Sequence, residues 1–250
     1  DEAFTITITY TPPEGTFIDT NGEGIGKTTL AALLACHPTI TQNFDVLWVS
    51  LDDGKPLDSE KYIQCLDALC RQIKAKPTWA ERILRLEDSP ARAIRELERM
   101  NRAKDCVTKL LESLEQNVMI VLDGIQDDQD FAWFHFFESQ SSIVVSKSHS
   151  IPGTTYTVEM EGLGESEALD LFASESSNDP DHPIFHTVEA RSLIELCAYH
   201  PLIIRTASHW FKMKQVTCGL SKGLEELLLE LSVLCNNKAV SGDSFKILTE

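Results

Sequence analysis

The stretch that decides the fold is TNGEGIGKTTLAALLA, from Thr20 to Ala35. Glycines alternate with other residues just before a lysine and two threonines, and an apolar helical pattern follows. A phosphate-binding loop needs this order, because a glycine turn lets backbone N–H groups point at phosphates and the next helix adds partial positive charge at its N-terminus. The stretch therefore predicts a nucleotide phosphate site. The alternative is a glycine turn before an ordinary core helix.

The motif G-x-x-x-x-G-K-[ST] assigns a role to each loop residue. Lys27 is expected to reach the β- and γ-phosphates, Thr28 to ligate Mg²⁺ and Thr29 to contact the α-phosphate. The first glycine position holds Asn21, a residue type that tolerates left-handed backbone angles, so the turn can survive. Glu23 would repel a polyphosphate unless it points to solvent. The predicted nucleotide contacts in this loop are Asn21, Gly22, Gly24, Ile25, Gly26, Lys27, Thr28 and Thr29.

A second element of the same site is VMIVLD, residues 118–123. A continuous apolar run suits a strand that is buried on both faces of a parallel sheet. The acid of a P-loop protein lies at the end of such a strand and holds Mg²⁺ directly or through water. Asp123 is therefore the predicted catalytic acid, and Thr28 and Asp123 are the predicted metal ligands. The alternative is an ordinary aspartate at a strand end.

The order of elements predicts the fold class. Strand patterns occur at 4–10, 16–19, 44–51, 118–123, 141–146 and 154–160. Most of them alternate with helical patterns, which favours a P-loop NTPase type of α/β fold: a parallel sheet with helices on both faces. After residue 162 only helical patterns remain, so an all-helical subdomain should follow. The predicted organisation is an N-terminal extension over 1–15, a nucleotide-binding domain over 16–162 and a helical subdomain over 163–250.

Composition argues against a nucleic-acid partner, a disulfide framework, a zinc site and a membrane span. The 250 residues carry a net charge of −17, and both predicted domains are acidic, so no nucleic-acid partner is expected. Seven cysteines, an odd number with no C-x-x-C pair, indicate free thiols in a reducing cytoplasm rather than disulfides or zinc. The histidines show no metal-ligand spacing. No apolar run is long enough to span a membrane.

Six blocks occur in a fixed order: GIGKTTLA, FDVLWVSL, VMIVLDGIQD, SSIVVSKS, LGESEALDLF and CAYHPLII. Over roughly residues 16–236 this order resembles the NB-ARC family of signal-transduction ATPases with numerous domains, which includes plant disease-resistance proteins and the apoptosome scaffold. The resemblance implies a switch in signalling or defence, with ADP in a closed state and ATP with Mg²⁺ in an open, oligomerising state. It also implies protein partners or self-association through domains outside this chain. Pro201 matches the proline of the G-L-P-L segment that lies against the nucleotide.

Three features of the family pattern are altered. The second acid is replaced by Gly124, the γ-phosphate-sensing arginine by Ser148, and the Gly-Leu of G-L-P-L by Tyr199 and His200. Hydrolysis needs an oriented water and a cation at the γ-phosphate. We therefore expect nucleotide binding with weak or no hydrolysis, at most a slow ATPase.

Other interpretations remain open from the sequence alone. Asp127 and Asp128 could supply a catalytic carboxylate, or they could be solvated loop acids. The chain could be a degenerate scaffold of the same fold that binds no nucleotide. It could also be an active P-loop small-molecule kinase or ATPase, which would need arginines over the phosphates. The arginines instead cluster at 81–102, in a segment whose pattern indicates a solvated helical face.

Overall fold

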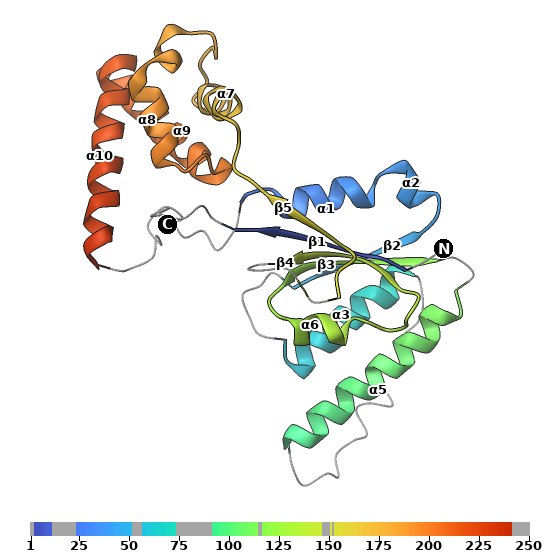
Figure 1. Cartoon of the computed structure of the whole chain (residues 1–250). Coiled ribbons are helices and arrows are strands. Elements are labelled where there is room, and N and C mark those ends of the chain that lie inside the picture. Colours follow the sequence, from blue (N-terminus) through green and yellow to red (C-terminus); the bar gives the residue numbers. More distant parts are fainter. Residues whose placement is uncertain are drawn as a thin grey trace. The chain divides into compact units, whose positions relative to one another are not determined.

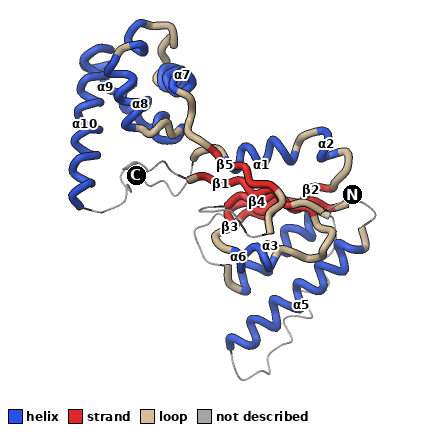
Figure 2. The backbone as a smooth tube through the Cα atoms, in the orientation of Figure 1, coloured by secondary structure: helices blue, strands red, loops and turns tan. Residues whose placement is uncertain are grey.

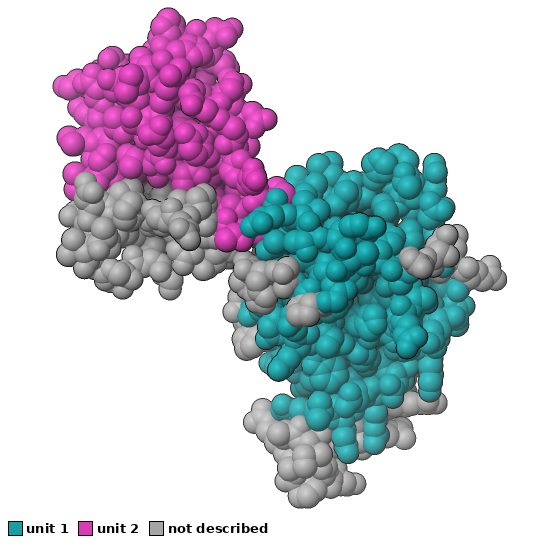
Figure 3. All heavy atoms as spheres, in the orientation of Figure 1, with its two compact units in different colours: residues 1–9, 27–159 teal, residues 10–26, 160–250 magenta. Residues whose placement is uncertain are grey.

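The computed structural model describes residues 3–11, 24–51, 57–73, 92–114, 117–146, 151 and 153–241. The chain forms two compact units (Figure 3). Unit 1 comprises residues 1–9 and 27–159, and unit 2 comprises residues 10–26 and 160–250. Each unit has its own hydrophobic core.

One five-stranded sheet organises the α/β part of the chain, with strand order β2-β3-β4-β1-β5 (Figure 1). The strands are β1 (Thr5–Tyr10), β2 (Asp45–Ser50), β3 (Val118–Ile125), β4 (Ser141–Ser146) and β5 (Tyr156–Met160). The pairs β2–β3, β3–β4 and β1–β4 are parallel, so the carboxyl ends of these four strands lie at one edge. Strands β3 and β4 are buried along their whole length, as expected for the middle of a parallel sheet.

The position of β1 corrects one expectation. The sequence predicts a strand at residues 4–10 within an N-terminal extension over 1–15, but β1 (Thr5–Tyr10) lies inside the sheet between β4 and β5. Its Thr/Ile alternation shows only that this is a strand, whereas its partner, Ser141–Ser146, lies more than a hundred residues away in sequence. The strand predicted at 16–19 falls outside the described residues.

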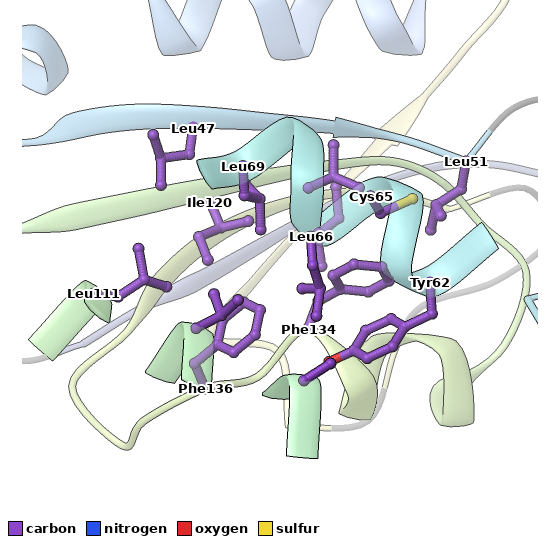
Figure 4. Packing of buried hydrophobic residues seen from close by; sticks show 14 of the residues in the cluster. Leu47, Leu51, Tyr62, Cys65, Leu66, Leu69, Leu111, Ile120, Phe134 and Phe136 are labelled. Atoms are coloured by element: carbon purple, nitrogen blue, oxygen red, sulfur yellow. The ribbon is translucent and has the colours of Figure 1, made fainter. Parts of the chain in front are cut away.

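Helices cover both faces of the sheet (Figures 1 and 2). One face carries α1 (Lys27–Ala35) and α2 (Pro38–Thr41). The opposite face carries α3 (Ser59–Gln72), α5 (Arg92–Glu112) and α6 (Asp128–Trp133). The second face forms the larger core, in which side chains such as Leu66, Ile120 and Phe134 pack together (Figure 4). The predicted sheet with helices on both faces is confirmed.

Unit 2 has the predicted all-helical part. Its elements are α7 (Glu165–Glu175), the 3₁₀ helix η1 (Pro183–His186), α8 (Val188–Leu196), α9 (Pro201–Cys218) and α10 (Leu220–Ser241). Three phenylalanines pack together in its core: the ring of Phe172 meets Phe185 edge to face and Phe211 at a tilt, with centroids 5.7 and 5.2 Å away. None of the described helices is long and apolar enough to cross a membrane.

Candidate functional site

The start of α1 is where the sequence predicted a phosphate. Lys27 is the first residue of the helix, and only 7% of its surface is exposed. The helix packs on β3 and β4 and has no acidic residue in its first turn. The partial positive charge at the helix N-terminus is therefore not offset by a carboxylate of the helix itself. Thr29 follows as an exposed residue of the same turn.

Thr28 and Asp123 meet in unit 1. The Thr28 hydroxyl donates a hydrogen bond of 3.0 Å to Oδ1 of Asp123, across 95 residues of sequence. Asp123 lies near the carboxyl end of β3, pairs with Ser50 and Val145, and is 6% exposed. The two predicted metal ligands are thus neighbours, brought together because α1 begins at the edge where β3 ends.

This pair of side chains fits Mg²⁺ chemically. Mg²⁺ prefers oxygen ligands and is usually held by one or two protein groups, with water and phosphate completing the coordination. A hydroxyl and a carboxylate 3.0 Å apart meet that requirement. Among the described residues no group of three or more His, Cys, Asp or Glu side chains could hold a metal by itself. The pair therefore suits a metal that arrives with a phosphate.

The topology places this pair at a favourable position of the sheet. From β1 the chain runs to β2 at one edge, whereas β5 lies beyond β1 at the opposite edge. In open α/β sheets, ligands bind outside the carboxyl ends of the strands where the connections diverge. The start of α1 and the end of β3 both lie at the carboxyl ends of the parallel strands.

Gly124, which stands where the NB-ARC resemblance places a second acid, has a structural role. Its φ is +91°, a backbone conformation that side-chain-bearing residues rarely adopt. The register between β3 and β4 shifts there, since Asp123 pairs with Val145 and Ile125 with Ser146. Gly124 is therefore the extra residue of a β-bulge that follows the predicted catalytic acid.

The two acids after the strand belong to the start of α6. Asp127 is the N-cap residue, and its Oδ1 accepts a hydrogen bond of 2.8 Å from the Asp130 N–H. Asp128 is an exposed residue of the first turn. Burial, with a contribution from Asp127, raises the pKa of the Asp130 carboxyl. This arrangement supports the interpretation of Asp127 as a capping residue rather than a catalytic base.

The glycine turn belongs to unit 2 and leads directly into Lys27. Gly24 and Gly26 have φ values of +77° and +105°, so both use the freedom that glycine supplies. Ile25 between them is 4% exposed. A Cβ added to Gly24 would lie 2.5 Å from Cβ of Leu202, so that leucine packs directly on the turn.

The contact with Leu202 was missed from the sequence. Pro201, predicted to lie against the nucleotide, is the first residue of α9, and it is the following residue that reaches Gly24. The order His-Pro-Leu in the CAYHPLII block was the only sequence signal that could have indicated this contact. Four predicted or discussed positions lie outside the described residues: Asn21, Gly22, Glu23 and Ser148.

Comparisons with known proteins show little about this chain. No family model and no curated protein matches it, so the resemblance to the NB-ARC family remains a resemblance. Among solved structures 42 chains match. One is the ORC2 protein of Aeropyrum pernix in its ADPNP–ADP complexes, with a TM-score of 0.49 and 10% identity. The match covers 92% of this chain and 62% of that chain, less than two thirds of its length. A likeness of this degree says nothing about function. The fold, with Lys27 and Thr28 opening α1 and Asp123 near the end of β3, is of the P-loop NTPase type.

Proposed function

We propose that this chain is the ADP- and ATP-binding switch domain of a signalling or defence protein, with weak or no hydrolysis. The observation that carries the proposal is the hydrogen bond between Thr28 and Asp123, beside the buried Lys27. These three side chains come from the two elements that a P-loop site requires, which supports binding of a polyphosphate with Mg²⁺.

Each group would have a distinct task in binding. The backbone N–H groups of the glycine turn and of the first turn of α1 would donate hydrogen bonds to the phosphates. Lys27 would supply positive charge at the β- and γ-phosphates. Thr28 and Asp123 would offer oxygen ligands to Mg²⁺, which, when bound, neutralises charge on those phosphates. Pro201 would lie close to the nucleotide at the start of α9.

Turnover is expected to be close to background. An efficient NTPase orients a water and stabilises charge on the γ-phosphate, and loss of one such cation costs about 10³-fold or more in rate. Gly124 has no side chain to orient water, and Asp127 already accepts the α6 capping hydrogen bond. Ser148 stands where the resemblance places an arginine. Binding and hydrolysis are therefore separable in this chain.

A titration with fluorescent ADP tests the proposal. Wild-type protein should bind in the presence of Mg²⁺, and Lys27→Ala should abolish binding, because it removes the cation nearest the predicted β-phosphate. Lys222→Ala is the matched control, since Lys222 is a 70% exposed lysine on α10. Its affinity should equal that of wild type. Absence of binding by wild type at millimolar ADP and ATP would instead support a scaffold that uses no nucleotide.

A turnover assay separates the remaining alternative. An ordinary kinase-like enzyme turns over at about 1 s⁻¹ or faster. If wild type reaches that rate and Lys27→Ala loses it, the chain is an active kinase or ATPase and the switch proposal is wrong. The assay should include candidate phosphate acceptors, so that transfer and hydrolysis are distinguished.

The biological setting is part of the proposal: the signalling role and the protein partners rest on the resemblance, and the cytoplasmic setting rests on the free cysteines. The switch would act in the cytoplasm, and protein partners or self-association would involve other domains. The domain division at 16–162 and 163–250 belongs to the same proposal. Pull-down of full-length protein in its ADP and ATP states would test whether partners follow the nucleotide.

A further inference from the structure

The connection between α8 and α9 contains an unusual backbone. We call residues 198–202 the elbow. Ala198 and Tyr199, two consecutive residues with side chains, have φ values of +50° and +56°. Only one other described non-glycine residue, Ser177, has a positive φ. Such conformations are disfavoured for residues with a Cβ and persist where the surroundings fix them.

Several contacts within unit 2 fix the elbow. The Leu163 N–H donates a hydrogen bond of 2.9 Å to the Tyr199 carbonyl. A Cβ at Gly162 would lie 3.1 Å from Cβ of Tyr199, so this backbone also lies close. The ring of His200 contacts Tyr10, at the end of β1, edge to face with centroids 5.9 Å apart. The elbow is thus held from the segment after β5 and from the segment that leads into the glycine turn.

The far end of the elbow contacts the glycine turn itself. If Gly24 carried a Cβ, that atom would lie 2.5, 2.7 and 3.0 Å from Cβ, Cδ2 and Cγ of Leu202. Leu202 nevertheless stays 37% exposed, and it is not a member of the hydrophobic core of unit 2. Packing of that core therefore does not explain why the leucine lies there. Outside α9, Leu202 lies against Gly24, in the turn that precedes Lys27.

We propose that the elbow is a clamp for the phosphate loop and that Leu202 is its positioning residue. A glycine turn is conformationally free and loses that freedom when it binds an anion, which weakens binding. A side chain pressed on Gly24 removes part of that freedom beforehand. The strained Ala198 and Tyr199 backbone is retained because it delivers Leu202 to the turn. This inference rests on the proposed nucleotide binding, which the clamp would strengthen.

The primary test measures the turn without any nucleotide. Amide hydrogen exchange at Ile25, Gly26 and Lys27 should become about tenfold faster in Leu202→Ala, since this change removes Cγ and Cδ2 from the turn and leaves only the Cβ to resist local opening. Leu202→Met, which keeps the bulk, should restore slow exchange. Leu229→Ala is the matched control, because Leu229 is a 66% exposed leucine of the same unit. Its exchange in the turn should equal that of wild type.

The second readout is affinity for ADP. Leu202→Ala should raise the Kd about tenfold, on the scale of coupling between neighbouring sites, while the thermal midpoint of the nucleotide-free protein stays near that of wild type. Leu202→Met should recover the affinity. A merely structural role would lower the thermal midpoint instead. Equal Kd and equal exchange in wild type and Leu202→Ala would overturn the clamp.

Glycine substitutions test the strained backbone independently. Tyr199→Gly removes the Cβ that opposes the left-handed conformation, so exchange in the turn should slow or stay slow. Ser177→Gly relieves the same kind of strain elsewhere and should leave the turn unchanged. Faster exchange in Tyr199→Gly would show that the tyrosine side chain, rather than the elbow conformation, holds the loop. If wild type binds no nucleotide, the proposed function fails, but the exchange measurements still decide whether Leu202 fixes the turn.

Discussion

Gly124 shows how one backbone conformation limits the chemistry next to Asp123. Its φ of +91° and its burial at a bulge leave no conformation in which an acid could be placed there without strain. The residue after Asp123 thus forms the bulge near the end of β3 and cannot orient a water.

The first prediction follows from this backbone. Gly124→Ala should lower the free energy of unfolding by about 1–2 kcal/mol, the cost of a left-handed residue with a Cβ, measured by urea denaturation. Gly219→Ala provides a comparison, because Gly219 has φ +81° with no heavy atom within 4 Å of an added Cβ. Gly124→Asp should also be destabilised, so any gain in hydrolysis must be measured on protein shown to be folded. If Gly124→Ala is as stable as wild type, the strain argument is wrong.

A second residue-scale prediction concerns the pH dependence of stability. Burial raises the pKa of Asp130 above 3.8, so the folded state binds this proton more tightly than the unfolded state does. The free energy of unfolding therefore falls as pH rises through the interval from 3.8 to the raised pKa. Asp130→Asn should stabilise the protein slightly at pH 7 and leave it unchanged near pH 3. The gain should be a few tenths of a kcal/mol, because partial exposure screens the charge.

Denaturation of Asp130→Asn at the two pH values checks this sign. Asp128→Asn, an exposed change in the same helical turn, is the control. A gain at pH 3 that equals the gain at pH 7 would mean that the carboxyl charge is not responsible.

At the scale of elements, the outer edge of the sheet is protected by a side chain. Strand β2 is an edge strand, and the last residue of α3, Gln72, pairs with its backbone. The Trp48 N–H donates to Gln72 Oε1, and Gln72 Nε2 donates to the Trp48 carbonyl, both at 2.7 Å. The amide thus imitates one residue of a neighbouring strand. Open strand edges otherwise promote pairing with other chains.

The corresponding prediction is that Gln72→Ala loosens this edge. Loss of two partly exposed hydrogen bonds should cost about 1–2 kcal/mol of unfolding free energy, measured by urea denaturation. Self-association should increase, measured by light scattering against concentration. Gln64→Ala on the same helix is the control, since the Gln64 side-chain amide donates a long hydrogen bond of 3.5 Å to the exposed Glu60 side chain. Equal behaviour of both variants would show that the edge needs no such protection.

For the whole molecule, binding and folding should be linked. Lys27, Thr28 and Asp123, the residues predicted to bind the phosphates and Mg²⁺, all belong to unit 1, which has its own core. A ligand that binds only the folded chain adds about 2.7 kcal/mol at a concentration 100 times its Kd. Saturating ADP with Mg²⁺ should therefore raise the thermal midpoint of wild type. Lys27→Ala should show no shift, and an equal shift in both proteins would place the nucleotide elsewhere.

The sequence by itself determined several features, each of them local. The strand and helix periods predicted the α/β class and the helical part after 162, because burial of one face leaves a repeat in the neighbouring residues. The order of glycines, Lys27 and Thr28 predicted the start of α1, and an apolar run ending in an acid predicted the buried end of β3. Their meeting could be anticipated because parallel strands end at one edge.

The tertiary structure alone decided the features that depend on distant partners. The place of β1 inside the sheet, the bulge at Gly124 and the contact of Leu202 with Gly24 leave no repeat in the sequence. Each depends on how two segments that are distant in sequence fit together, at a register or a close approach that neither segment encodes alone. Side-chain periodicity reports that a face is buried, but the identity of what buries it is fixed only when the whole chain packs.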